Sequence, residues 1–166
     1  MNTKRLFLTA LALSLPLVPA ALAAAPQAQS AAASARASWT AERLSRATFV
    51  VLAPEIQGNK NLVTGDQLST VLTAMKNDSA AAIKRRYPGA TIATDPNMPG
   101  AIRVTPVLYA PSALVPWATM SGQWRMDFPE GGRVLLNGDR LNVLTVYGHG
   151  GDAANFVFDG VARKLP

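Results

Sequence analysis

The residues "DQLSTVLTAMKNDSAAAIKRRYPG", Asp66 to Gly89, contain the clearest periodic pattern of the chain. Apolar and small side chains recur every three or four residues, which places them on one face of a helix. That face comprises Leu68, Val71, Leu72, Met75, Ser79, Ala82, Ile83 and Arg86. Basic residues 84–86 follow in the last turn, where cations complement the helix dipole, and Pro88 and Gly89 end the pattern. We therefore expect one helix of about six turns.

Strand patterns flank this helix on both sides. "ATFVVLAPEI" (47–56) is a β-branched and aromatic run that stops at Pro54, which is typical of a buried strand. "AIRVTPVLYA" (101–110) and "ATMSGQWRMDF" (118–128) alternate between apolar and polar residues, and Pro106 indicates an edge position or a bulge. "RVLLNGDRLNVLTVYG" (133–148) predicts two strands that form a hairpin about Asn137 and Gly138.

Shorter helices are predicted near the two ends of this region. "SWTAERLSR" (38–46) has Ser38 or Thr40 available as the N-cap. "DAANFVFDGVARKL" (152–165) carries a helical apolar stripe, with Asp152 at the N-cap position and basic residues in the last turn. This order of elements predicts an α+β fold, with a mainly antiparallel sheet and with the long helix and a C-terminal helix packed on one face.

The first 37 residues indicate where the protein is located. Basic residues Lys4 and Arg5, an apolar stretch and the small-residue site "ALA" (21–23) predict a signal peptide over 1–23 and export to the periplasm or beyond; an uncleaved membrane anchor is the alternative. Residues 24–37 are rich in Ala and Ser and predict a flexible leader. Residues 38–166 are long enough for a single domain, and no later run of about 18 apolar residues predicts a transmembrane segment after cleavage.

Composition narrows the classes of partner. The chain has no cysteine, so neither a disulfide nor a lipid-modified N-terminal cysteine is available. Two of the sixteen basic residues lie in the predicted signal peptide, so the mature chain has fourteen basic and ten acidic residues, a net charge of +4. This charge favours peripheral contact with an anionic envelope surface and is too small and dispersed to predict nucleic-acid binding.

The one histidine lies in "VYGHGGDAANF" (146–156), among glycines that suit a turn. A single histidine without cysteine cannot build a structural zinc site of the usual kind, so we predict no metal, no cofactor and no catalytic role for His149. Carboxylates that could serve glycoside hydrolysis are Asp127, Glu130, Asp139, Asp152 and Asp159. Their places in turns, at a cap and on a helix surface favour solvated side chains instead.

Two features are candidates for binding a partner. In "YAPSALVPWATM" (109–120), Tyr109, Leu114, Val115 and Trp117 crowd a proline-flanked loop that would form an apolar patch if exposed. The alternative is that Leu114 and Trp117 fold back over the edge of the sheet. The second candidate is the basic helix end, Lys84, Arg85 and Arg86, for which dipole complementarity and solubility are the alternative explanation.

The order of elements resembles small exported domains of the bacterial envelope, such as the N-terminal domain of TolB and the CsgG-like accessory proteins. "FVVLAPEI", the helix over 66–87, "AIRVTPVLYA" and "DAANFVFDGVARKL" carry the resemblance. It implies a soluble, non-catalytic binding or assembly module with an envelope protein as partner. Two alternatives stay open: a cofactor-free hydrolase of an envelope polymer, and a domain that binds a small apolar ligand between helix and sheet, near Met75, Ile83 and Trp124.

Overall fold

The predicted long helix is present in the computed structural model, which describes residues 37–59, 61, 66–113, 115 and 117–166. Helix α3 runs without a break over Asp66–Arg86. Met75, Ser79, Ala82 and Ile83, which share the predicted apolar face, are buried. The predicted signal peptide and residues 24–36 of the predicted leader lie outside the described residues. None of the helices in the described part of the chain has the length and hydropathy needed to cross a bilayer.

A mixed sheet forms the centre of the fold. Its strands are β1 (Thr48–Val51), β2 (Glu55–Gly58), β3 (Thr91–Ala93), β4 (Ile102–Ala110), β5 (Thr119–Asp127), β6 (Arg133–Asn137) and β7 (Leu141–Asn142). The order is β3-β1-β4-β5-β6, with β2 also beside β4 and β7 beside β5. The pairs β1–β3, β1–β4 and β2–β4 are parallel, whereas β5 is antiparallel to β4, β6 and β7. The α+β class is confirmed, and the sheet is parallel on one side and antiparallel on the other.

Pro106 marks an interruption at the centre of the sheet. Val51 pairs with Val104 and Glu55 with Val107, so three residues on the β1–β2 side face two on β4, which is the pattern of a bulge. The Leu52 amide donates to the Val104 carbonyl at 2.8 Å. Because strand residues repeat every two positions, Pro106 also faces the interruption, where no N–H is required. The edge alternative is wrong because β4 is central, and β4 itself pairs with β5 without interruption, so the extra residue lies in the loop between β1 and β2.

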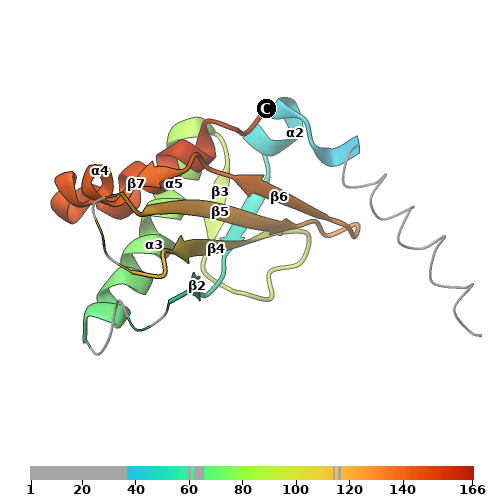
Figure 1. Cartoon of the computed structure of the whole chain (residues 1–166). Coiled ribbons are helices and arrows are strands. Elements are labelled where there is room, and N and C mark those ends of the chain that lie inside the picture. The colour runs from blue at the N-terminus through green and yellow to red at the C-terminus, as the bar shows by residue number, and fades with distance from the viewer. Residues whose placement is uncertain (1–36, 60, 62–65, 114, 116) are drawn as a thin grey trace, which may run out of the picture.

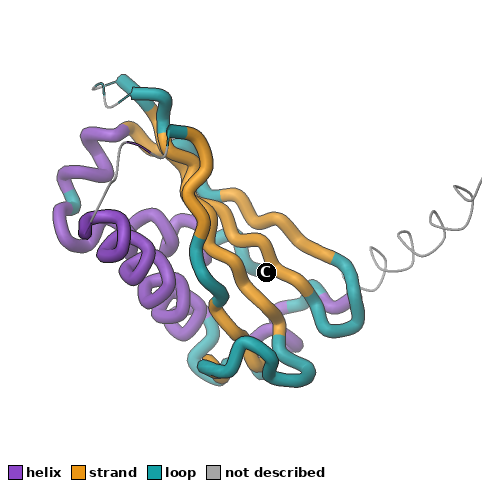
Figure 2. The backbone as a smooth tube through the Cα atoms, turned by 90° about the horizontal axis from the view of Figure 1, so that it is seen from below, coloured by secondary structure: helices purple, strands orange, loops and turns teal. Residues whose placement is uncertain are grey.

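One buried indole joins the sheet to both long helices. Trp124 on β5 stacks against Phe158 of α5 (Ala153–Ala162), with ring centroids 6.4 Å apart and planes 3° from parallel. Its Nε1–H donates to the Ser79 Oγ of α3 at 3.0 Å. Figure 2 shows both helices on the same side of the sheet, and the hydrophobic core fills the space between them. The predicted packing of the two helices on one face is therefore present.

The opposite face of the sheet, here called the open face, is lined largely by polar side chains. Its residues alternate with those of the core and include Thr105, Tyr109, Gln123, Arg125 and Asn137. Arg125 on β5 forms an ion pair with Glu55 on β2, and β4 lies between these two strands. The ion pair therefore lies across β4, which accounts for the burial of Thr105 and Val107 beneath it.

The predicted hairpin over 133–148 is wrong. β7 pairs with β5 rather than with β6, and the chain then enters helix α4 (Val143–Gly148). The Asn142 side chain begins α4 by accepting a hydrogen bond from the Leu144 amide at 2.8 Å. The β-branched residues of 143–146 favour a strand by propensity, but this cap and the burial of Val143 and Val146 determine the helix.

Asp152 stands at the N-cap position of α5, as predicted, but its side chain makes no capping hydrogen bond. Residues Gly150–Asp152 already form a short 3₁₀ turn, η3. The Ala153 amide therefore has a backbone partner, the Gly150 carbonyl. His149 lies between α4 and η3, which confirms the predicted turn, although a helix precedes it instead of a strand.

Gly122 permits the close approach of α5 to β5 and provides a test of this packing. A Cβ there would lie 2.7 Å from Val157 Cγ1 and 3.2 Å from Val161 Cγ2. We expect Gly122→Ala to lower the free energy of unfolding by about 1–3 kcal/mol, the usual cost of overpacking. Urea denaturation measures this change. Gly148→Ala is the control, because nothing lies within 4 Å of the Cβ that alanine would add and helical alanine is favoured; equal losses in both variants would contradict the packing described.

Candidate functional site

The basic helix end makes contacts within the molecule. Lys84 Nζ donates to the Pro88 carbonyl at 2.7 Å and to the Ala90 carbonyl at 2.8 Å. Arg85 forms an ion pair with Asp159 of α5 at 2.7 Å. Arg86 donates to carbonyl oxygens of the last two residues at 3.0 and 3.1 Å. These side chains therefore hold α5 and the C-terminal residues against α3, which favours the structural explanation for the basic cluster.

The predicted apolar loop is divided between two surfaces. Leu114 lies outside the described residues, and Val115 is half-buried. Trp117 has 77% of its surface exposed, so it does not fold back over the sheet edge. Tyr109 lies on the open face, where its hydroxyl donates to Gln123 Oε1 at 3.2 Å. Of the four predicted patch residues, Trp117 is the one described as both exposed and located in the loop.

Two uncharged stretches meet beside Trp117. Neither 104–124 nor 141–151 contains a lysine, arginine or acidic residue. The pairing of Thr119 with Asn142 joins them, and the Val143 amide donates to the Ala118 carbonyl at 2.9 Å. We call the described residues of 111–120 and 141–151 the charge-free end. Figure 1 shows α4 and β7 together at one end of the molecule.

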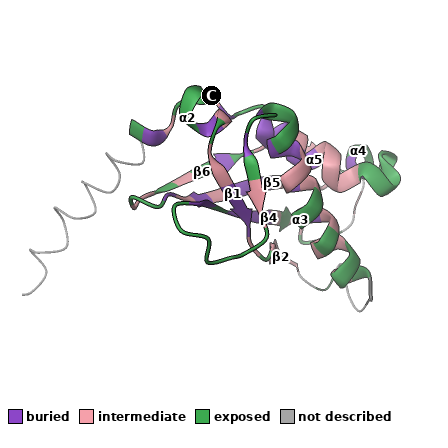
Figure 3. Ribbon diagram, turned by 180° about the vertical axis from the view of Figure 1, so that it is seen from behind, coloured by how far each residue is buried: buried purple, intermediate pink, exposed green. Residues whose placement is uncertain are grey.

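The charge-free end exposes large apolar side chains. Trp117 is joined there by Leu144 and Tyr147 of α4, with 60% and 59% of their surfaces exposed. Figure 3 shows α4 with exposed residues over much of its surface. Exposed apolar side chains that gather in this way are typical of interaction surfaces, whereas scattered ones are ordinary.

An apolar pocket of about 330 Å³ adjoins this surface. It lies between α3, α4, α5 and the ends of β4 and β5, and its walls include Met75, Leu108, Met120 and Phe158. Small residues such as Ala154 leave the space open. Tyr147 lines the pocket and is also largely exposed, so the pocket and the charge-free end are continuous. The volume is at the lower end of the range of small-molecule sites.

The pocket matches the predicted apolar-ligand site only in part. Met75 lines it, as predicted. Ile83 and Trp124 do not line it, and both are completely buried in the core. Leu144 and Tyr147 were missed by the sequence interpretation, since residues 141–148 were expected to form a strand. The lack of charge over 141–151 was the available signal.

Most of the groups that a hydrolase would need are held in separate contacts. The His149 ring stacks on Phe156, with centroids 3.8 Å apart. Four of the candidate carboxylates form separate ion pairs, Asp127–Arg133, Glu130–Arg43, Asp139–Lys164 and Asp159–Arg85. In the described part of the chain, no three His, Cys, Asp or Glu side chains are grouped as metal ligands would be.

One carboxylate near the α3–α5 contact has a perturbed pKa. Burial raises the pKa of Asp78, Arg85 lowers it, and the charges of Asp152 and Asp159 raise it further. Perturbed groups often mark active sites when they line a cleft. Asp78 lines neither the apolar pocket nor the clefts beside Ala41–Ser45 and on the open face, so it lacks the cleft position that such active-site groups have.

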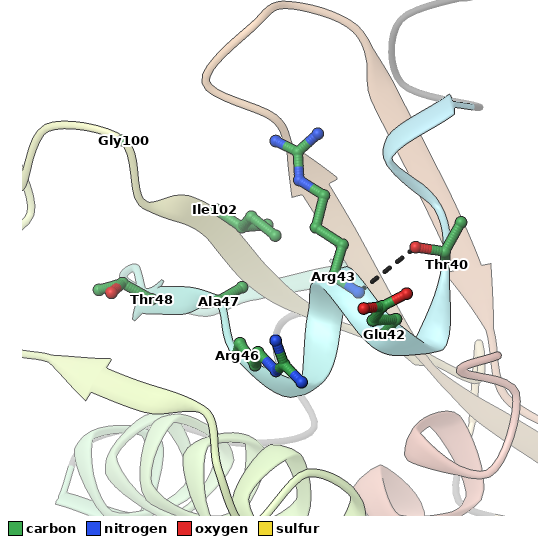
Figure 4. Close-up of a pocket in the computed structure, with 8 residues that line it drawn as sticks. All are labelled: Thr40, Glu42, Arg43, Arg46, Ala47, Thr48, Gly100 and Ile102. Carbon is green, nitrogen blue, oxygen red and sulfur yellow. Dashed lines mark hydrogen bonds between the residues drawn. The ribbon is translucent and has the colours of Figure 1, made fainter.

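A second cleft, of about 530 Å³, lies beside α2 (Ala41–Ser45). Thr40 begins this helix, as predicted, by accepting a hydrogen bond from the Arg43 amide at 3.3 Å. Figure 4 shows the Arg43 side chain extending away from α2, with its guanidinium group far from that of Arg46 on the other side of the helix. Arg43 also forms an ion pair with Glu130 at 2.8 Å. The two cations therefore do not converge on a common ligand position.

Comparisons with known proteins leave the function to be argued from this geometry. No family model matches the chain, and no curated protein matches it at a significant level. A solved structure described as "Crystal structure of uncharacterized protein" is similar to it, with 11% sequence identity and a TM-score of 0.43. The match covers 73% of this chain and 88% of that chain.

A larger side chain at position 154 tests whether the apolar pocket can accept additional atoms. We expect Ala154→Leu to raise the free energy of unfolding by about 0.5–2 kcal/mol, because the added methylene groups enter an existing cavity. Chemical denaturation provides the measurement. Ala82→Leu is the matched control on α3, where the side chain is fully packed, and it should lower stability by about 1–3 kcal/mol. A similar loss in both variants would show that the pocket has no room.

The anchoring of α2 predicts a dependence of stability on pH. Burial of Glu130 raises its pKa, but hydrogen bonds from Ser38 and Arg43 outweigh burial and lower the pKa below 4.5. A lowered carboxyl pKa stabilises the fold above about pH 4.5, and this contribution is lost as pH falls through the folded-state pKa. Glu130→Gln should therefore cost up to about 1 kcal/mol at pH 7, and the difference from wild type should vanish near pH 3.

Urea unfolding at a series of pH values measures this difference. Glu42→Gln, on α2, is the control for the change in net charge alone. A constant difference between Glu130→Gln and wild type at all pH values would contradict the ionic origin of the effect.

Proposed function

We propose that the protein is an exported, non-catalytic binding module of the bacterial cell envelope, and that it binds an apolar segment of a partner protein at the charge-free end. The observation that carries the proposal is the exposure of Trp117, Leu144 and Tyr147 on two segments that pair with each other, together with the apolar pocket that Tyr147 lines. Exposed aromatic side chains next to a pocket are the usual energetic centre of a protein interface. The envelope location follows from the predicted signal peptide and from the resemblance to envelope domains.

The shape of the charge-free end favours a protein segment over a bilayer surface. A pocket accepts a group that protrudes from its partner, such as a leucine or phenylalanine side chain, whereas a bilayer presents no such group. Proteins that lie on anionic membranes also place Lys and Arg beside their apolar residues. Residues 111–120 and 141–151 contain neither.

The arrangement of ionisable groups supports a non-catalytic role. Hydrolysis by paired carboxylates requires two of them to face one another across a substrate cleft. Asp127, Glu130 and Asp159 are instead each paired with an arginine from another segment. Their chemistry is that of surface ion pairs that join segments of the fold.

Site-specific cross-linking in cells that export the protein tests the proposal. A photo-cross-linking residue at position 144 should capture one protein reproducibly, and that protein should then bind the purified chain directly. Leu144→Asp should weaken this binding by about tenfold or more, because it places a charge in an apolar contact.

Leu135→Asp is the matched control, since Leu135 on β6 is also an exposed leucine but lies on the open face. Both variants should unfold at the same denaturant concentration as wild type within error. Equal binding by the two variants, or capture only of a second copy of the chain, would refute the proposed partner.

The pocket gives specific support to a second function, the binding of a small apolar ligand. Its volume of about 330 Å³ and apolar walls suit a short acyl or aromatic group. Native mass spectrometry of the purified chain should then detect a bound molecule that Ala154→Leu excludes. Under the partner hypothesis the purified chain carries no such molecule, so the two functions are distinguishable.

A further inference from the structure

A polar cleft of about 510 Å³ lies on the open face, on the other side of the sheet from the apolar pocket. It is formed where β4 ends, where β5 begins and where β6 ends. Because side chains alternate along a strand, Leu108 faces the pocket while Tyr109 and Ser121 line the cleft, and Met120 lines both. The same two strand ends thus build two different surfaces.

A chain of hydrogen bonds fixes the side chains at the base of the cleft. The Tyr109 hydroxyl donates to Gln123 Oε1 at 3.2 Å, and Gln123 Nε2 donates to Asn137 Oδ1 at 2.5 Å. Gln123 has only 9% of its surface exposed, so its amide is held between its two neighbours. Because Asn137 uses its oxygen in this chain, its NH₂ group is left to donate to a ligand.

The cleft has a cation and no carboxylate. Arg140 lines it and is exposed, and among the described residues no acidic side chain pairs with it. The adjacent Asp139 is paired with Lys164 of the C-terminal segment at 3.0 Å. Arg140 and the Asn137 NH₂ group therefore offer donors in the cleft, which a ligand with acceptor oxygens matches.

We propose that this cleft binds an acidic saccharide, a sugar ring that carries a carboxylate. Arg140 offers several N–H groups in the geometry that a carboxylate accepts. Asn137 and the hydroxyl groups of Thr119 and Ser121 supply partners for ring hydroxyls, and the partly exposed ring of Tyr109 offers a flat apolar surface. The C–H face of a pyranose fits such a surface, which a simple anion or an extended peptide would leave unused.

This inference can be tested separately from the proposed function, because only Thr119 and Met120 of the cleft also belong to the charge-free end. A chain without a protein partner can bind a saccharide, and the reverse also holds. Arg140 and Leu144 lie outside each other's sites, so their variants separate the two proposals.

Titration of the ¹⁵N-labelled full chain with trigalacturonate, its methyl ester and acetate tests the inference. Trigalacturonate should shift amide signals of residues around the cleft, such as Ser121 and Asn137, with saturable binding. The methyl ester keeps the ring but lacks the charge, so its affinity should be lower than that of trigalacturonate by about tenfold or more. Arg140→Gln should reduce affinity for trigalacturonate to the same degree and leave affinity for the ester unchanged.

Arg46→Gln is the matched control, because Arg46 is likewise an exposed arginine beside a cleft but lies next to α2. It should leave binding unchanged, and both arginine variants should keep the wild-type melting temperature. Tyr109→Phe, which keeps the ring and removes the donor to Gln123, gives a second test and should weaken both saccharides alike. Equal binding of acetate and trigalacturonate, equal effects of the two arginine variants, or no binding at millimolar concentration would overturn the proposal.

Discussion

The position of both long helices depends on the burial of the Trp124 indole. Its ring fills the space between β5 and Phe158 of α5, while its N–H is satisfied by Ser79 of α3. A buried N–H without a partner costs about 1–3 kcal/mol, so the register of α3 against the sheet is tied to this one bond. Gly122, two residues earlier on the same face, lets α5 approach β5 closely. The helix–sheet packing therefore has one anchor and one point of close contact on the same strand.

The apolar pocket results from the small side chains that lie next to Trp124 and Phe158. Toward the ends of β4 and β5, the large core side chains give way to small ones, among them Ala74, Ala153 and Ala154, while η3 contributes glycines. The close-packed rings of Trp124 and Phe158 fix the distance between the helices and the sheet. The helices therefore cannot move closer to the sheet where the side chains are small. A tight core at one end thus leaves room at the other.

Alternation along two strands explains why binding features occur on both sides of the sheet. Successive residues of β4 and β5 serve the core side and the open face in turn, so one segment of chain supplies apolar groups to one side and hydrogen-bonding groups to the other. On the open face, the ion pair between Arg125 and Glu55 covers β4, and the hydrogen-bonded chain around Gln123 begins where that cover ends. The polar side chains of the open face are therefore held in place by ion pairs and hydrogen bonds to one another.

The sequence by itself determined those elements whose tertiary contacts favour the same structure as their local pattern. The apolar stripe of 66–86, the Thr40 cap and the interruption at Pro106 each depend on a few consecutive residues, and each is present. The same reasoning failed for residues 141–148, where the outcome depends on a contact with a distant segment, and it did not foresee that the Asp152 side chain makes no capping bond. β7 pairs with β5, and the turn η3 supplies a backbone partner before any side chain is needed. Only the tertiary structure brings the two uncharged stretches together and sets Tyr109 apart from Trp117, since strand pairing across the chain is invisible to local periodicity.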